Sequence, residues 1–473
     1  MNLLGMLIRI TFTCFPHNVD EKAENGGIME RAQTLGEEKI STLLWRFSLP
    51  AITGMVINAL YNVVDSIFVG HGVGEIGLAA VTIAFPIMTI LMGFGMLVGV
   101  GASAVASLRI GQHKQQEAEK ILGNAFTLAA ILSITLAAGL LLYLDPILIM
   151  LGAETAVLPY AREFTRIILL GSIFMYIGFG LNNMVRAEGN PRMAMSTVLI
   201  SAGLNILLNP LFIFIFNLGI GGSALATVVS QGVSAIWVIV YFLGEKSLLK
   251  LRLSNLRLDK DIVSSIFKIG LSPFLMQMAA SVVTVVFNYS LLAYGGELAV
   301  ASIGIINRIA MLMLMPIFGL SQGVQPIIGY NYGAKNYGRV TQSLKIAVYV
   351  ATIFATIGFI LVQSFDKQII MLFNDNPELI RIGSFGMRLQ LCMLPVIGFQ
   401  IIGANYFQAV GKAGYAIVLS MSRQVIILIP LLFILPGLLG LNGAWLASPI
   451  ADLGSAILTG LFLFKEIRKL GIM

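Results

Sequence analysis

Long apolar stretches separated by short polar segments make up most of this chain. Stretches of roughly 20 or more mainly apolar residues are long enough to cross a bilayer as helices. We find twelve such stretches, at about 44–70, 77–107, 122–144, 163–187, 192–216, 219–243, 262–294, 298–330, 340–365, 380–408, 413–436 and 440–465. The pattern predicts an all-α, polytopic membrane protein with twelve transmembrane helices.

Composition supports a membrane location and excludes other classes. Of the 473 residues, 57% are hydrophobic and only 11% are charged, which is too apolar for a soluble globule. The net charge of +7 comes from basic residues that lie singly between apolar stretches, so we expect no nucleic acid partner. The two cysteines, Cys14 and Cys392, form no spaced pair, and neither a metal site nor a disulfide is indicated.

Lysine and arginine are concentrated in alternate loops, most densely between residues 244 and 261. The intervening loops are mostly acidic or neutral. By the positive-inside rule, both termini are cytoplasmic. We expect the chain to lie in the plasma membrane of a prokaryotic cell. Residues 1–28 lack a convincing cleavage site, and we interpret them as lying upstream of the functional start at Met29.

An internal repeat appears when the chain is shifted by about 222 residues. Glu75 then falls on Glu297, and the AEG ending at Gly189 falls on the AVG ending at Gly411. Two six-helix halves of equal orientation are parallel repeats, and a central cleft between them is where transporters usually bind substrate. The predicted parts are a lead (1–43), an N-lobe (44–243), a linker (244–261), a C-lobe (262–465) and a cytoplasmic tail (466–473).

Asp65 is a carboxylate inside the first apolar stretch, with Asn58, Tyr61 and Asn62 on the same helical face at i, i+3, i+4 and i+7 spacing. A charge at mid-membrane costs roughly 3 kcal/mol on insertion scales. Asp65 is therefore a candidate functional residue.

Two later stretches carry polar stripes that could meet Asp65 in the first bundle. Asn205 and Asn209 are four residues apart in the fifth stretch, as are Ser223 and Thr227 in the sixth. One carboxylate among neutral oxygens suits Na⁺ or a proton. For the asparagines and threonine alone, interhelical hydrogen bonds of about 0.6 kcal/mol are the simpler interpretation, but the buried charge of Asp65 favours an ion site.

The chain resembles the multidrug and toxic compound extrusion (MATE) family from about residue 36 onward. The resemblance lies in SLPAI and YNVVDSIFVG of the first stretch, RAEGNPRMAMSTVLISAGLNILLNPLFIF with GIGGSALATVVSQ, and NRIAMLMLMPIFGLSQGVQPIIGYNYGAKNYGRV. It implies a V-shaped pair of six-helix bundles, alternating access, and export of cationic or amphipathic drugs and dyes in exchange for H⁺ or Na⁺. It implies neither enzymatic activity nor a cofactor, and we expect a monomer.

The resemblance assigns the N-lobe cation site to Asp65, Asn205 and Thr227, and a helix-bending role to Pro50. The sequence departs from the family at Asn209, where many relatives have a second aspartate before the proline. Asp65 would then carry the coupling charge of this lobe alone, with Asn209 as a neutral neighbour.

Further polar residues in apolar stretches are weaker candidates. Arg308 could contact substrate, or could tie its helix to carbonyls or to a carboxylate such as Asp452. Asp452 could be a second proton site, but we favour its being the partner of a nearby cation. Candidates for the substrate cleft are Tyr61, Asn62, Gln277, Asn288 and Arg308.

Three other functions remain as alternatives. A flippase for lipid-linked saccharides would need several basic residues in the cleft to hold a pyrophosphate, and Arg308 and Arg423 are too few to favour it. A membrane enzyme would need a convergent set of acids, bases or metal ligands, which the sequence does not indicate. A channel would need a recognisable filter.

Overall fold

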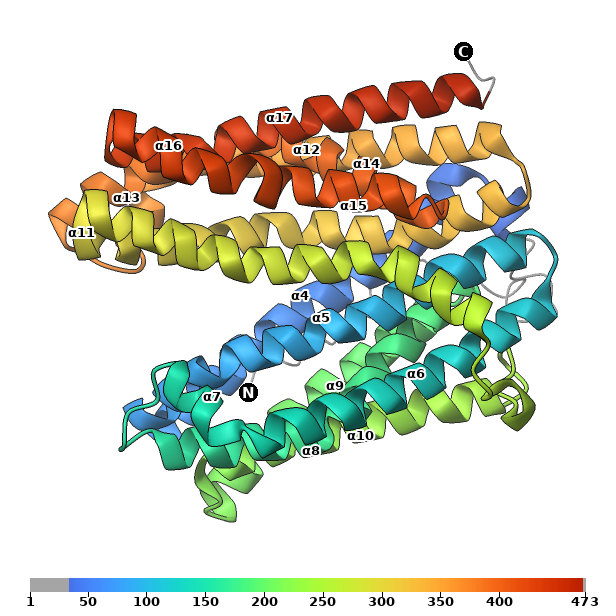
Figure 1. Ribbon diagram of the computed structural model, residues 1–473, viewed down its shortest axis with the longest axis horizontal. Helices are drawn as coiled ribbons and strands as arrows, with labels where there is room; N and C mark the ends of the chain where they lie inside the picture. The colour runs from blue at the N-terminus through green and yellow to red at the C-terminus, as the bar shows by residue number, and fades with distance from the viewer. Residues whose placement is uncertain (1–33, 471–473) are drawn as a thin grey trace.

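The computed structural model describes residues 34–470, so the interpretation of residues 1–28 lies outside the described part. Two helical bundles follow each other along the chain (Figure 1). The first contains α4 (Ile40–Gly72), α5 (Glu75–Gly111), α6 (Gln115–Leu142), α7 (Leu144–Met150), α8 (Leu158–Ala187), α9 (Pro191–Pro210) and α10 (Gly219–Leu243). The second contains α11 (Lys260–Gly333), α12 (Tyr337–Met371), α13 (Pro377–Gln390), α14 (Leu394–Ala409), α15 (Ala413–Met421), α16 (Ile429–Leu439) and α17 (Leu441–Lys469).

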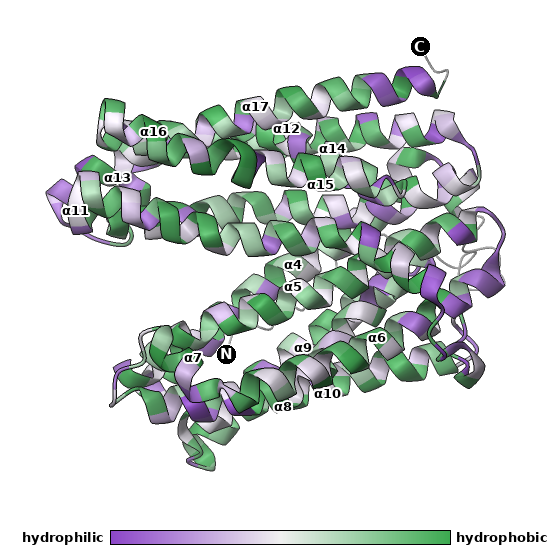
Figure 2. Ribbon diagram, viewed as in Figure 1, coloured by the Kyte–Doolittle hydropathy of each residue, from purple (hydrophilic) through white to green (hydrophobic). Residues whose placement is uncertain are grey.

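The described residues confirm the predicted number of spans. Ten helices are long and apolar enough to cross a membrane, and the pair α13 and α14, bent by 48°, makes an eleventh span. The 74 residues of α11 contain two helices that meet at Gly296, where φ is 68°, so α11 supplies two spans and the total is twelve. In Figure 2 apolar residues cover the lengths of the helices and polar residues gather at their ends.

The two bundles form a V, as predicted. They meet at the end that carries residues 244–259, here called the linker end, and diverge toward α7 and α13, here called the open end (Figure 1). At the linker end the two backbones touch because glycines face carbonyl groups. A Cβ at Gly270 would overlap the Leu97 carbonyl, and a Cβ at Gly111 would overlap that of Tyr330.

The basic linker is fixed to the first bundle by hydrogen bonds from α6. Gln115 Nε2 donates to the Leu248 carbonyl at 2.7 Å, and Thr127 Oγ1 donates to that of Leu256 at 2.8 Å. Asn124 Oδ1 accepts from the backbone N–H of Asp259 at 2.8 Å. Asp259 is also the N-cap of α11, so the hydrogen bond from α6 fixes the point at which the second bundle begins.

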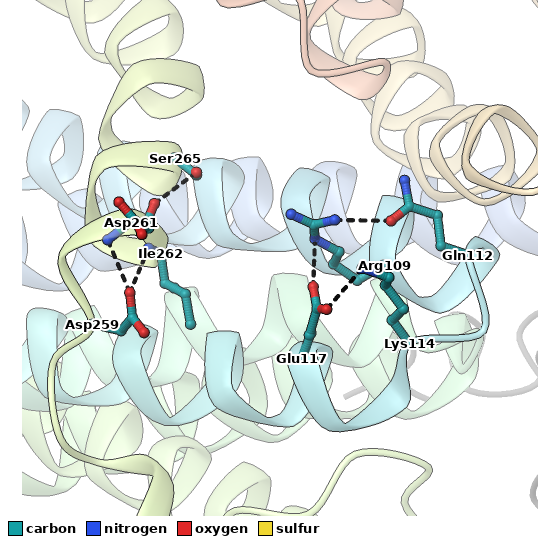
Figure 3. Close-up of polar contacts among 8 residues, drawn as sticks. All are labelled: Arg109, Gln112, Lys114, Glu117, Asp259, Asp261, Ile262 and Ser265. Carbon is teal, nitrogen blue, oxygen red and sulfur yellow. Dashed lines mark hydrogen bonds and ion pairs between the residues drawn. The ribbon is translucent and has the colours of Figure 1, made fainter.

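Figure 3 shows this cap and the turn beside it. Asp259 Oδ1 accepts from the N–H groups of Asp261 at 2.9 Å and Ile262 at 3.3 Å. Across the α5–α6 turn, Glu117 forms ion pairs with Arg109 at 3.2 Å and with Lys114 at 2.9 Å. These exposed pairs contribute little energy, so the buried contacts of α6 hold the linker.

Glu188, in the α8–α9 loop, is a buried carboxylate at the linker end that was not identified from the sequence. It is 2% exposed and accepts hydrogen bonds from Ser247 Oγ at 2.8 Å, from the Leu249 N–H at 3.1 Å and from the Tyr241 hydroxyl. Burial raises the pKa of Glu188 to about 7, although these hydrogen bonds act in the opposite direction.

Glu188 predicts a specific pH dependence of stability. Because its folded-state pKa lies above the usual glutamate value of 4.5, the contribution of Glu188 to stability is complete below about pH 4.5 and is lost as pH rises to about 7. Relative to Glu188→Gln, the parent protein should lose up to about 3 kcal/mol of unfolding free energy between pH 4.5 and pH 8. Thermal unfolding in detergent measures this difference. Parallel pH profiles would contradict it, and the exposed Glu154→Gln serves as control.

Candidate functional site

Asp65 lies in α4 on the side that packs against α9 and α10. Its Oδ1 accepts a hydrogen bond from Ser223 Oγ of α10 at 3.0 Å and another from Asn209 Nδ2 of α9. The three helices therefore meet at one carboxylate inside the first bundle.

The remaining predicted residues extend this network. Asn205 Nδ2 donates to Thr227 Oγ1 at 3.1 Å, and Asn209 Nδ2 lies 3.5 Å from Asn205 Oδ1. Thr227 thus reaches Asp65 only through the two asparagines. Ser223, which was absent from the predicted set, contacts the carboxylate directly, and its place one turn before Thr227 was the signal that could have identified it.

The helix changes from α to π geometry directly after Asn209 and Pro210. Pro210 follows Asn209 and has no N–H to donate, and residues Leu211–Ile215 continue as a π-helix. Single π-helical turns are frequent at functional sites because they redirect side chains within a helix. Asn209 is 0% exposed, so this irregular turn places a polar side chain deep in the bundle.

An unsatisfied acceptor lies beside the carboxylate. Asn209 Oδ1 is buried and has no hydrogen-bond partner. Among the described residues, Asp65 forms no ion pair with lysine, arginine or histidine. A partly buried carboxylate without a basic partner, held by an asparagine whose amide oxygen is unsatisfied, fits a monovalent cation or a proton.

The second lobe has no comparable polar group at the corresponding place. With the repeat shift of 222, Phe287 occupies the position of Asp65. Its ring is buried and lies 6.2 Å, centroid to centroid, from that of Trp445 on α17. The repeat has therefore kept a polar site in one lobe and an aromatic pair in the other.

The structure brings few of the cleft candidates to this site. Tyr61 is partly buried one turn before Asp65, whereas Asn62 is exposed and donates to the Asn58 carbonyl of its own helix at 2.7 Å. Gln277 lies on α11 against Gly93 of α5, at the contact between lobes. Asn288 is partly buried in the same helix. Pro50 is buried within α4, and its bending role stays a prediction.

Asp452 is paired with Arg423, whose Nε lies 2.5 Å from Asp452 Oδ1. This agrees with the interpretation of Asp452 as the partner of a cation. Of the alternatives for Arg308, pairing with Asp452 is wrong, because Arg423 of η3 (Ser422–Leu428) already engages that acid. Arg308 itself is exposed and has no ion pair within residues 34–470.

Comparison with known proteins points to one family. A family model described as MatE matches residues 50–211 and 273–434, which are the two halves of the repeat. The multidrug export protein MepA of Staphylococcus haemolyticus strain JCSC1435 is 29% identical over 434 residues, covering 92% of this chain and 95% of that protein.

Solved structures give the same answer at the level of the fold. A structure described as MATE in the bent conformation matches with a TM-score of 0.88 and 26% identity, over 93% of this chain and 98% of that one. The MATE multidrug transporter DinF-BH, solved in complex with rhodamine 6G, matches with a TM-score of 0.86 and 41% identity over 93% and 98%. Both likenesses span both bundles.

Proposed function

This chain belongs to the MatE family of multidrug efflux transporters, a family of multi-pass membrane proteins and not of enzymes, and on that premise we propose that it is an antiporter. It exports cationic or amphipathic small molecules in exchange for H⁺ or Na⁺ by alternating access. Asp65 is the residue that couples the two movements.

The observation that carries this proposal is that Asp65 is held by Asn209, whose amide oxygen has no hydrogen-bond partner. Two neutral side chains, Ser223 and Asn209, hold the carboxylate, and Asn205 and Thr227 extend the network behind Asn209. An ion that neutralises Asp65 changes the charge buried between α4, α9 and α10. Coupling requires that ion and substrate favour different states of the lobes.

Charge distribution supports a cytoplasmic linker end. The helix ends and loops there carry Arg109, Lys114, Lys246, Lys250 and Arg252, and basic segments beside membrane spans remain inside. The lobes, which touch at this end and diverge at the other, then correspond to an outward-facing state from which substrate leaves. Both termini are cytoplasmic in this orientation.

Substrate class follows from the relatives and from the walls of the V. One solved relative holds rhodamine 6G, a cationic dye, and the MepA proteins are described as multidrug exporters. On α4, Val56, Leu60, Val63 and Ile67 are 40–57% exposed and form an apolar wall. The flippase alternative loses support because one of its two candidate arginines, Arg423, forms an ion pair with Asp452. Arg308 is then the remaining candidate to hold a pyrophosphate.

Transport by purified protein in proteoliposomes tests this function. We expect rhodamine 6G to move against its gradient when an opposing gradient of H⁺ or of Na⁺ is imposed, and the two gradients applied separately identify the ion. The control is the same vesicles with the gradient collapsed by an ionophore. Absence of movement under both gradients would contradict antiport.

A further inference from the structure

Arg308 is the residue that the proposed coupling scheme leaves unexplained. It lies in the second half of α11, 12 residues after the turn at Gly296 and hence roughly 18 Å into the span at 1.5 Å per residue. It is exposed, and within the described part of the chain no acid or hydrogen-bond partner contacts it. Arg423 and Arg388, by contrast, form ion pairs with Asp452 and Asp366.

The helix face of Arg308 can be assigned from contacts further along α11. A Cβ at Gly319 would lie 2.6 Å from the Ile52 Cα, so Gly319 faces α4 of the other lobe. Arg308 precedes Gly319 by 11 residues, which is close to three helical turns, and therefore lies on the same face. The lobes diverge from the linker end toward the open end (Figure 1). The helix spacing from Gly319 therefore places Arg308 on the face of α11 that is turned toward α4.

Exposed apolar side chains lie near Arg308 on both walls, together with the exposed Asn307 beside it and Asn62 next to Val63. Across the V, Val63 of α4 follows Ile52 by eleven residues and therefore lies on the same face of that helix. Its side chain is 57% exposed. Beside Arg308, Met311 and Leu312 are 58% and 57% exposed. Asp65 points away from this face, into the first bundle, where Ser223 and Asn209 hold it.

An unpaired guanidinium among apolar side chains is costly within a membrane span unless a ligand or water satisfies it. Its planar fork of donors matches a carboxylate, which it binds through two parallel hydrogen bonds. Apolar side chains around such a group suit the hydrocarbon or aromatic body of an amphipathic molecule.

We propose that Arg308 is a specificity-determining residue that binds the carboxylate of amphipathic, zwitterionic substrates in the V between the lobes. This inference rests on the proposed export function and deepens it by naming the residue that recognises one group of its amphipathic substrates. The cationic part of such a substrate lies away from Arg308, because like charges repel. A cation without a carboxylate gains nothing from Arg308.

Two dyes that differ in one group provide the test. Rhodamine 6G is an ethyl ester, and its free acid carries a carboxylate on the same cationic ring system. Export of each is measured in proteoliposomes for the parent, Arg308→Gln and Arg308→Lys. We expect Arg308→Gln to slow export of the free acid at least tenfold while export of the ester stays within about twofold, and Arg308→Lys to give an intermediate rate for the acid.

The ester is an internal control for folding, since a misfolded variant loses both dyes. Arg381→Gln, at an exposed ion pair with Glu378 near the open end, should leave both rates unchanged. Equal effects of Arg308→Gln on the two dyes, or no effect on either, would overturn the inference. One of these results is expected if a lipid phosphate, and not a substrate carboxylate, binds Arg308. The inference about Arg308 is also overturned if the parent protein exports the ester but not the acid. A parent that exports neither dye overturns the proposed function itself.

Discussion

Asp65→Asn should reduce gradient-driven export to the level of cells that lack the protein, a loss of more than tenfold. Asparagine keeps the size of the side chain and an oxygen that can accept from Ser223 and Asn209, so the contacts between α4, α9 and α10 persist. It cannot take up a proton or present a charge to Na⁺. A membrane potential of 100 mV supplies about 2.3 kcal/mol for each charge moved, and the variant moves none at this site.

Efflux of rhodamine 6G from intact cells, at equal expression, measures this loss. Binding of the dye to purified Asp65→Asn should stay within a few-fold of the parent, which separates loss of coupling from loss of structure. Glu75→Gln removes an exposed acid at the start of α5 and should export normally. If Asp65→Asn exports as well as the parent, Asp65 does not couple transport.

Much of the architecture could be predicted because the membrane restricts the chain. Backbone groups in lipid must be satisfied within helices, so each long apolar stretch identified a span, and the repeat identified two lobes. The turn at Gly296 followed from the short gap between the seventh and eighth stretches. The break between α13 and α14 was missed, since both halves form one apolar stretch.

The site was predicted in part for a similar reason. The cost of burying Asp65 identified it, and helical spacing identified the stripes of Asn205, Asn209 and Thr227. Spacing along one helix does not determine which residue of a stripe reaches a neighbouring helix, so Ser223 was passed over for Thr227. The pairing of Asp452 with Arg423 likewise depends on how α17 packs against η3.

Under the proposed alternating access, Gly270→Ala should disfavour the outward-facing state by forcing the lobes apart at the linker end. The added Cβ would overlap the Leu97 carbonyl, and neither group can move without moving its helix. A destabilisation of about 3 kcal/mol would shift the balance away from the outward-facing state by roughly 150-fold. Export should then fall at least tenfold, because substrate cannot be released from a state that rarely forms.

Cysteine labelling separates this effect from misfolding. In a background with Cys14→Ser and Cys392→Ser, Val63→Cys reports on the open V, since Val63 is 57% exposed there. A membrane-impermeant maleimide added outside cells should label it at least tenfold more slowly when Gly270→Ala is present. Leu142 lies at the end of α6 and is 79% exposed, so Leu142→Cys should be labelled at the same rate with and without Gly270→Ala. Gly139→Ala is the matched control, because a Cβ there meets no atom within 4 Å. Unchanged labelling of Val63→Cys would show that the contact of Gly270 with Leu97 does not stabilise the outward-facing state.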